Sequence, residues 1–352
     1  MSGAYPRAEA ASPCMEHVAS PQAAAAPAPI LRIRGLSVSF ASEHGPVPAL
    51  RGVDLDVAAG RCVGIVGESG SGKSVTSLAV MGLLPQPGAR VTGGSIEFEG
   101  RNLLAMPAAL RRAQRGRAIA MIFQDPLSSL NPAFTIGDQI AEAIVAHEAV
   151  ERREARRRAI ELLRQVHIAS AERRVDDYPH RLSGGMRQRV MIAMALACSP
   201  RLLIADEPTT ALDVTVQAQI VELLDEIRRE RGTAIVLISH NLGLVAGLAD
   251  EIAVMYAGRI VEHGPAARVI SHPEHPYTVG LLGAVPRAEP GNAPLVAIAG
   301  SVPDLRALPP GCAFAPRCPF RIDACQTLDP ALRSLGSAHS GACHAAPLEP
   351  NA

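Results

Sequence analysis

The stretch Gly67-Glu68-Ser69-Gly70-Ser71-Gly72-Lys73-Ser74 decides the fold of this chain. It fits the pattern G-x-x-x-x-G-K-[ST], in which a glycine-rich backbone turns its N–H groups toward a phosphate and a lysine reaches the same anion. Lys73 is the only lysine among 34 basic residues; the others are arginine. A compact ammonium on a flexible stem can thread through such a loop, whereas a guanidinium is planar and wide. The sequence therefore predicts a phosphate-binding loop, with the Ser74 hydroxyl as an Mg²⁺ ligand.

Apolar segments on both sides place this loop between a strand and a helix. Arg61–Val66 has the apolar run of a short buried strand, and Val75–Leu84 that of a helix. The positive N-terminal end of the helix then points at the bound anion. Ile33–Phe40 alternates apolar and polar residues, as a half-buried antiparallel strand does. Together these patterns predict an α/β fold.

Two acidic residues follow a second apolar strand. Leu202–Ala205 is typical of a buried parallel strand, and Asp206 and Glu207 come directly after it. The carboxyl ends of such strands form the ligand-binding edge of open α/β sheets. Asp206 is therefore predicted to hold Mg²⁺ through water, and Glu207 to orient or deprotonate an attacking water.

A second glycine-bearing helix start lies at Ser183-Gly184-Gly185, which precedes the apolar run Val190–Ala197. Exposed amides at a helix N-terminus form an anion site. One nucleotide does not need two such sites on one chain, so we expect this one to cap a nucleotide held by another chain. An ordinary serine N-cap accounts for Ser183 but does not explain both glycines.

Composition limits the classes of function. The 352 residues carry no net charge, only 3% are aromatic and none is tryptophan, which argues against a nucleic-acid partner. No apolar run reaches the roughly 18 residues of a membrane span. Residues 1–29 are rich in Ala, Pro and Ser, and prolines interrupt any apolar stretch a signal peptide would need. We predict a disordered tail there.

These motifs resemble those of the ATP-binding subunit of ABC transporters, over about residues 31–265. The resemblance implies a P-loop ATPase core with an antiparallel β-subdomain and a helical subdomain at about 126–182. Gly67–Ser74 with Val75 then corresponds to the Walker A loop, and Phe40 to the aromatic residue that stacks on adenine. Gln124 and Asp206 are then expected to contact Mg²⁺, and Glu207 and His240 to take part in catalysis. Asp213 would belong to the D-loop. The signature motif would comprise Ser183, Gly184, Gly185 and Gln188.

The resemblance also implies a mechanism and partners. Two such subunits would enclose two ATP molecules head to tail, each between one Walker A loop and the other chain's signature motif. The expected partners are a second ATPase subunit, as a paralogue in a heterodimer, two transmembrane permease subunits and an extracytoplasmic solute-binding protein. The subunit would be peripheral, on the cytoplasmic face of the membrane. The alternatives are a soluble ABC ATPase not coupled to transport and a metal-sensing regulatory protein.

The C-terminal part of the sequence indicates a particular group of ABC transporter ATPases. His275–Leu282, Ile298–Pro303 and Leu308–Pro319 resemble the tail of oligopeptide/dipeptide importer ATPases, a group that includes nickel importers. The resemblance implies ATP hydrolysis that energises uptake of di- or oligopeptides or a related solute. The predicted organisation is a tail at 1–29, an ATPase domain at 30–268 and an extension at 269–352.

Four of the seven cysteines lie in this extension, at Cys312, Cys318, Cys325 and Cys343. Their spacing, C-x5-C-x6-C-x17-C, lacks the C-x2-C pairs of zinc knuckles and differs from the ferredoxin patterns. Four thiolates could hold a [4Fe–4S] cluster, a Zn²⁺ ion or two disulfides, or remain free. A proline-rich segment with few apolar residues needs a staple to fold. We therefore predict a structural metal centre, with [4Fe–4S] ahead of Zn²⁺.

Overall fold

The computed structural model describes residues 28–125, 129–210, 212–284 and 298–348. The predicted tail lies outside these ranges except for its last two residues, and Pro29 already begins the first strand. Ala211 of the expected D-loop and the first three residues of the expected helical subdomain are also outside. Within the described part, no helix is long and apolar enough to cross a bilayer.

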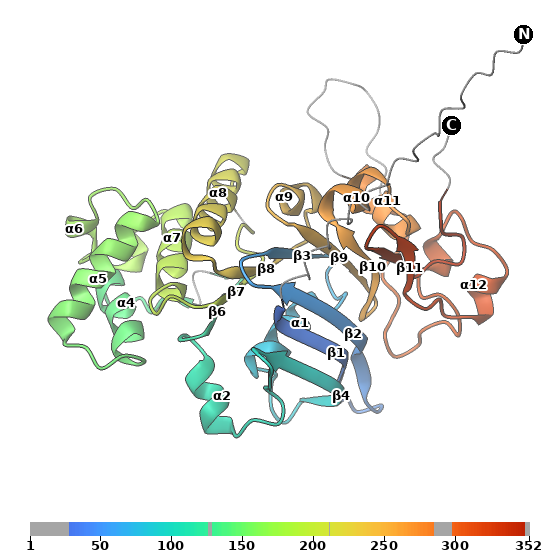
Figure 1. Cartoon of the computed structure of the whole chain (residues 1–352), viewed down its shortest axis with the longest axis horizontal. Helices are drawn as coiled ribbons and strands as arrows, with labels where there is room; N and C mark the ends of the chain where they lie inside the picture. The colour runs from blue at the N-terminus through green and yellow to red at the C-terminus, as the bar shows by residue number, and fades with distance from the viewer. Residues whose placement is uncertain (1–27, 126–128, 211, 285–297, 349–352) are drawn as a thin grey trace, which may run out of the picture.

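Two sheets form the framework (Figure 1). The smaller is antiparallel, in the order β2-β1-β4-β5, and consists of β1 (Pro29–Phe40), β2 (Val47–Ala58), β4 (Ala89–Phe98) and β5 (Arg101–Asn102). The larger has the order β11-β12-β10-β9-β3-β8-β7-β6 and is parallel from β9 to β6. Its strands are β3 (Cys62–Val66), β6 (Ile119–Ile122), β7 (Leu202–Asp206), β8 (Ala234–Ser239), β9 (Glu251–Tyr256), β10 (Arg259–Pro265), β11 (Arg333–Gly336) and β12 (His339–Gly341).

The helices cluster in three places (Figure 1). At one end of the molecule lie α4 (Ile136–Val145), α5 (Arg152–Gln165), α6 (Ala171–Arg174), a 3₁₀ turn (Pro179–Arg181) and α7 (Gly184–Ala195). Along the sheets lie α1 (Lys73–Met81), α2 (Ala108–Gln114), α8 (Val214–Arg231) and α9 (Leu242–Ala246). The opposite end holds α10 (Ala266–Ser271), α11 (Pro276–Gly283), a second 3₁₀ turn (Ala315–Arg317) and α12 (Ala324–Thr327).

Both faces of the parallel sheet are buried, which explains the continuous apolar runs of its strands. Along β7, Leu202 and Ile204 pack with α1 and the antiparallel sheet, whereas Leu203 and Ala205 pack with the helices of the other face. The antiparallel sheet with α1, the parallel sheet and the helices on its other face thus form three layers. The loops that carry the predicted site residues follow the ends of the parallel strands. The predicted α/β fold of a P-loop ATPase core with an antiparallel subdomain is confirmed.

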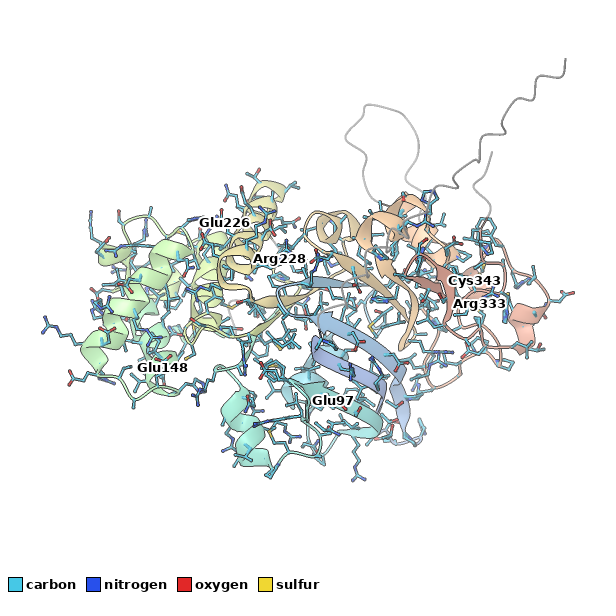
Figure 2. The ribbon with its side chains drawn as sticks, viewed as in Figure 1. Glu97, Glu148, Glu226, Arg228, Arg333 and Cys343 are labelled. Atoms are coloured by element: carbon cyan, nitrogen blue, oxygen red, sulfur yellow. The ribbon has the colours of Figure 1, made fainter. Side chains whose placement is uncertain are left out.

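Several arginines of helix α5 form ion pairs with nearby acidic residues. Arg156 pairs with Asp176 at 2.7 Å, Arg157 with Glu154 at 2.6 Å, and Arg158 with Glu148. Figure 2 shows Glu148 at the helical end of the molecule, away from the C-terminal extension. Most of these side chains are exposed, so the contacts mark a solvated face and add little stability.

The C-terminal extension continues the larger sheet. Strand β12 pairs with β10 through Glu262↔Gly341 and His263↔Ser340. The carboxylate of Glu262 is fully buried, and it accepts hydrogen bonds from the backbone N–H groups of Glu274 (2.7 Å) and His275 (3.0 Å). These bonds satisfy a buried charge, so removing residues beyond β10 would leave it unpaired. The division between domain and extension at 268/269 stays a prediction.

Candidate active site

The glycine-rich loop follows β3 and ends at Lys73, the first residue of α1. The Lys73 ammonium is buried and donates to the carbonyl oxygens of Gly67 (2.7 Å) and Glu68 (2.9 Å). Burial lowers the pKa of Lys73, and the nearby carboxylates of Glu207 and Asp206 oppose that shift. The ammonium is therefore held inside the loop by carbonyl oxygens, which an anionic ligand can replace.

Close packing explains two glycines of this loop. A Cβ at Gly67 would lie 2.3 Å from the carbonyl oxygen of Met255, a backbone atom that cannot move aside. Gly72 has a φ of 110°, and a Cβ there would lie 2.8 Å from the Leu50 side chain. The Ser71 hydroxyl is buried and has no hydrogen-bond partner within the described residues. An unsatisfied donor in a glycine-rich loop fits an anion site.

Ser74 and Asp206, the predicted Mg²⁺ ligands, lie side by side. The Ser74 hydroxyl donates to Oδ1 of Asp206 at 3.1 Å. Asp206 is only 5% exposed, and burial raises its pKa while the hydrogen bond from Ser74 opposes that shift. A hydroxyl and a carboxylate are hard oxygen donors, which Mg²⁺ prefers. The pair therefore fits the ion that the sequence predicts.

Glu207 is the point at which the predicted catalytic residues converge. Its Oε2 atom accepts from Gln124 Nε2 (3.2 Å) and from Thr210 Oγ1 (2.9 Å), and lies 3.3 Å from His240 Nδ1. Gln124 and His240 come from separate loops and are exposed, whereas Glu207 is half-buried. The structure thus brings Gln124, Glu207 and His240 together. The sequence analysis missed Thr210, although a hydroxyl three residues after the glutamate was a readable signal.

The backbone at Glu207 is strained. Its φ is +48°, a left-handed conformation that costs a non-glycine residue roughly 1–2 kcal/mol. Its N–H donates to the carbonyl oxygen of Ile238 at 2.9 Å, which anchors the residue to the end of β8. Such outliers persist where the surrounding structure fixes them, and they concentrate at functional sites.

The signature residues begin α7 on a different part of the surface. Ser183 is the N-cap, its hydroxyl accepting from the Met186 N–H at 3.4 Å, and Ser183 and Gly184 are exposed. A Cβ at Gly185 would lie 2.8 Å from Val216 on α8, so close packing of the two helices requires a glycine here, which the sequence did not indicate.

Asp213 caps α8 by accepting from the Val216 N–H at 2.9 Å. Gln188 is buried, and its amide nitrogen has no partner in the described part of the chain.

Phe40 and Val75 lie at the border of the core. Phe40 ends β1 opposite Val47 and Ala89, and is half-buried against the apolar cluster between the two sheets. Val75 packs against the same cluster from the first turn of α1. Their roles toward ATP stay predictions.

The four extension cysteines are neighbours without forming a metal site. All four are free thiols, so no disulfide joins them. Burial raises the pKa of Cys312, of Cys318 to about 11, and of Cys343, and neighbouring cysteines raise each further. Among the residues that the structure describes, no group of three or more His, Cys, Asp or Glu side chains is placed to hold a metal ion. The geometry of the described residues therefore supports neither a [4Fe–4S] cluster nor a Zn²⁺ ion.

Contacts that involve no metal also hold this segment. The Phe314 ring packs on Tyr256 (5.2 Å between centroids) and on Tyr277 (5.5 Å). The Arg333 guanidinium donates to the carbonyl oxygens of Cys343 (3.3 Å) and Ala346 (2.6 Å), and Figure 2 places Arg333 beside Cys343. Aromatic burial and hydrogen bonds to carbonyl groups are stabilising without a metal. The sequence analysis missed them because the partners are far apart along the chain.

Comparison with known proteins shows which family the chain is similar to. Residues 50–210 match the ABC transporter family, and residues 261–325 match the oligopeptide/dipeptide transporter C-terminal region. The chain is 51% identical over 315 residues to a probable peptide ABC transporter ATP-binding protein of Sinorhizobium fredii, covering 89% of this chain and 94% of the relative. It is 50% identical over 315 residues to the dipeptide transport ATP-binding protein DppD of Escherichia coli, covering 90% and 96%.

A solved structure is also similar to this chain. The dimeric post-hydrolysis state of the ATP-binding cassette MJ0796, bound to ADP and Pi, superposes with a TM-score of 0.60 at 27% identity. The match covers 67% of this chain and 98% of the cassette, so about a third of this chain has no counterpart there. The chain therefore belongs to the family of ABC transporter ATP-binding proteins, in the group that carries the oligopeptide/dipeptide transporter C-terminal region.

Proposed function

We propose that this chain is the ATP-hydrolysing subunit of an ABC importer for di- or oligopeptides or a related solute. The observation that carries the proposal is the convergence of Gln124, Thr210 and His240 on one carboxylate oxygen of Glu207. Beside it lie the paired Ser74 and Asp206. No member of a hydrolytic set is missing, which favours an active ATPase.

In this proposal the residues divide the chemistry among themselves. The backbone N–H groups of Gly67–Ser74 donate hydrogen bonds to the phosphates, and Lys73 exchanges its carbonyl partners for phosphate oxygens. Ser74 and Asp206, with Gln124, would hold Mg²⁺, which supplies positive charge to the β- and γ-phosphates when bound. Glu207 orients the attacking water and takes its proton, while Gln124 and His240 fix the carboxylate. Phe40 and Val75 complete the nucleotide contacts.

We also propose that the active unit contains two ATPase chains. Ser183, Gly184, Gly185 and Gln188 would act on the nucleotide of the second chain, with Asp213 at the junction. The exposed N-terminus of α7 supports this, because its amides are open to a ligand from outside the chain. We propose a paralogue as the second ATPase, two transmembrane permease subunits, a solute-binding protein outside the cell, and a peripheral place on the cytoplasmic face of the membrane.

Purification from the native membrane tests transport coupling. The affinity-tagged chain should retain two polytopic membrane proteins and a second ATP-binding chain in mild detergent. In that complex, a peptide-loaded solute-binding protein should raise ATP turnover several-fold above the unloaded protein. A matched preparation with Glu207→Gln controls for contaminating ATPases. If the chain purifies alone and hydrolyses ATP at the same rate with and without membranes, the soluble ATPase alternative is correct.

A [4Fe–4S] cluster on Cys312, Cys318, Cys325 and Cys343 stays a separate proposal. Its support is the donor set: four free thiols that lie between Cys312 and Cys343 in the extension. Soft thiolates of these four residues would suit the irons of such a cluster.

Anaerobic purification should give a brown protein with absorbance near ~400 nm and about four irons per chain. Cys318→Ser should lose the iron and keep ATP binding, because the nucleotide core is built from other residues. Cys198→Ser, which changes a free cysteine outside the extension, is the matched control. A colourless protein with four titratable extension thiols would remove the cluster from the proposal.

A further inference from the structure

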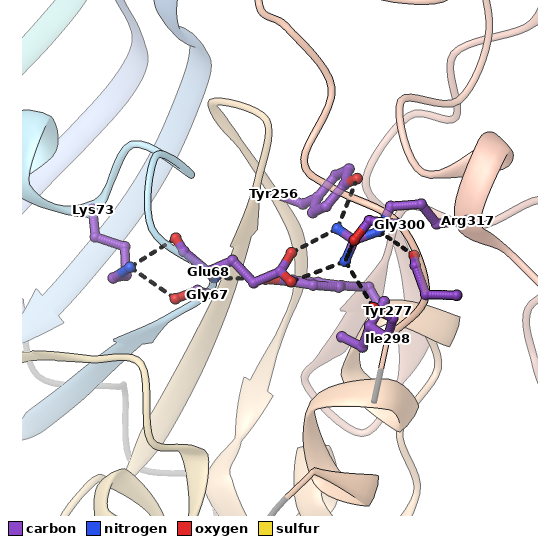
Figure 3. Close-up of polar contacts among 9 residues, drawn as sticks. Gly67, Glu68, Lys73, Tyr256, Tyr277, Ile298, Gly300 and Arg317 are labelled. Atoms are coloured by element: carbon purple, nitrogen blue, oxygen red, sulfur yellow. Dashed lines mark hydrogen bonds and ion pairs between the residues drawn. The ribbon is translucent and has the colours of Figure 1, made fainter. Parts of the chain in front are cut away.

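Glu68, the second residue of the phosphate loop, forms an ion pair and a hydrogen bond with residues of the C-terminal extension (Figure 3). Its carboxylate forms a two-point ion pair with the Arg317 guanidinium, at 2.7 and 2.9 Å. Its backbone N–H donates to the Tyr277 hydroxyl oxygen at 2.7 Å. Its carbonyl oxygen accepts from Lys73 Nζ at 2.9 Å. Three groups of one residue thus connect the extension to the lysine of the loop.

The first peptide plane of the loop is clamped from both sides. The Glu68 N–H and the Gly67 C=O belong to the same planar trans peptide, and so point in opposite directions. Tyr277 accepts from the N–H, and Lys73 Nζ donates to the C=O at 2.7 Å. Rotating this plane would break both hydrogen bonds. The fully buried Tyr277 on α11 therefore fixes the plane that carries the lysine's carbonyl partner.

Arg317 is itself held rigidly. Its side chain is only 5% exposed, and its guanidinium donates to the carbonyl oxygen of Ala299 at 2.9 Å. It also lies over the rings of Tyr256 (5.9 Å) and Phe314 (5.8 Å). A planar guanidinium suits such stacking and two-point pairing, whereas a lysine would give neither. The Arg317 guanidinium is therefore held in position by contacts that do not involve Glu68.

Charge gives this pair a consequence for binding. Glu68 places a carboxylate in a loop that receives the phosphates of ATP. Left unpaired, that carboxylate would repel the ligand in proportion to the ligand's negative charge. Arg317 neutralises it. The pair therefore does more than fasten the extension to the core.

We infer that Arg317 and Tyr277 are positioning residues of the ATP site, through which the C-terminal extension sets the affinity of the loop for phosphate. Arg317 cancels the Glu68 charge, and Tyr277 fixes the Gly67–Glu68 peptide. The inference rests on the proposed role of Gly67–Ser74 in binding phosphate. It assigns part of the nucleotide site to residues outside the ATPase domain expected from the sequence.

Nucleotide affinity of the full chain tests the inference. Arg317→Met should weaken ATP binding roughly tenfold, ADP binding less, and adenosine binding within a factor of about two, because the repulsion scales with ligand charge. The double variant Glu68→Gln/Arg317→Met should bind ATP within about threefold of wild type, since it removes both charges. Arg306→Met is the matched control: Arg306 also lies in the extension and pairs with an acid, Asp304.

A second variant preserves the packing. Tyr277→Phe keeps the ring and removes the oxygen that accepts from Glu68, so KM for ATP should rise about fivefold while kcat stays within about twofold. Equal losses for ATP, ADP and adenosine in Arg317→Met would overturn the inference, as would a double variant as weak as the single one. Lys73→Ala distinguishes failure of this inference from failure of the proposed function. If this variant binds ATP normally, the proposed phosphate-binding role of Gly67–Ser74 is itself wrong.

Discussion

Glu207→Gln should bind ATP normally and lower its turnover by roughly two to four orders of magnitude, the contribution expected of a general base. The amide has the shape of the carboxylate and can still accept hydrogen bonds from Thr210 and Gln124 through its oxygen. It cannot take a proton from water. The strained backbone at residue 207 is retained because the substitution does not change it. Single-turnover ATP hydrolysis in the assembled complex is the measurement.

A matched substitution controls for loss of a negative charge. Glu222→Gln changes an exposed glutamate on α8, and turnover should stay within about twofold of wild type. The Glu207→Gln chain should also accumulate as an ATP-bound dimer, since binding proceeds and release by hydrolysis does not. Turnover within a few-fold of wild type would show that another group activates the water.

Lys73→Arg should fail almost as completely as Lys73→Ala, although it keeps the positive charge. The ammonium lies buried between the carbonyl oxygens of Gly67 and Glu68, in a loop whose backbone is packed against Met255. A guanidinium is wider and cannot act as a point charge between the phosphates. We expect ATP affinity to fall roughly 10- to 100-fold, the range for loss of a charged hydrogen bond.

Equilibrium binding of ATP to both Lys73 variants, with thermal unfolding beside it, gives the measurement. An unchanged melting temperature would show that the loss concerns the ligand and not the fold. Near-normal binding by the arginine variant would contradict the idea that the loop requires a lysine.

Asp206 and Glu207 were readable from the sequence because they stand at the end of an apolar strand, whereas Gln124 and His240 were expected from the family resemblance. In the structure Asp206 ends β7, Glu207 follows it and His240 follows β8, so parallel pairing of β7 with β8 brings them to one edge. Gln124 follows β6, the neighbour of β7 in the same sheet. The ends of these neighbouring parallel strands therefore explain the convergence of the three side chains.

The contacts of the extension were not readable in this way. Nothing in the local sequence of Arg317 or Tyr277 points to Glu68, because the contact depends on how a distant segment packs. The cysteine spacing drew attention instead, and led to the expectation that a metal holds the segment together. Aromatic packing around Phe314 and the hydrogen bonds of the buried Glu262 contribute to that cohesion in the structure.

The ion pair between Glu68 and Arg317 joins residues that the ribosome synthesises at well-separated times. The two residues are 249 positions apart, and a ribosome adds about 5 to 20 residues per second. Roughly 10 to 50 s of translation therefore separate them. During that interval the nascent loop carries an unopposed carboxylate, and Tyr277 arrives before Arg317. The phosphate loop is thus made well before the residue that balances its charge, and the pair forms only after Arg317 has left the ribosome.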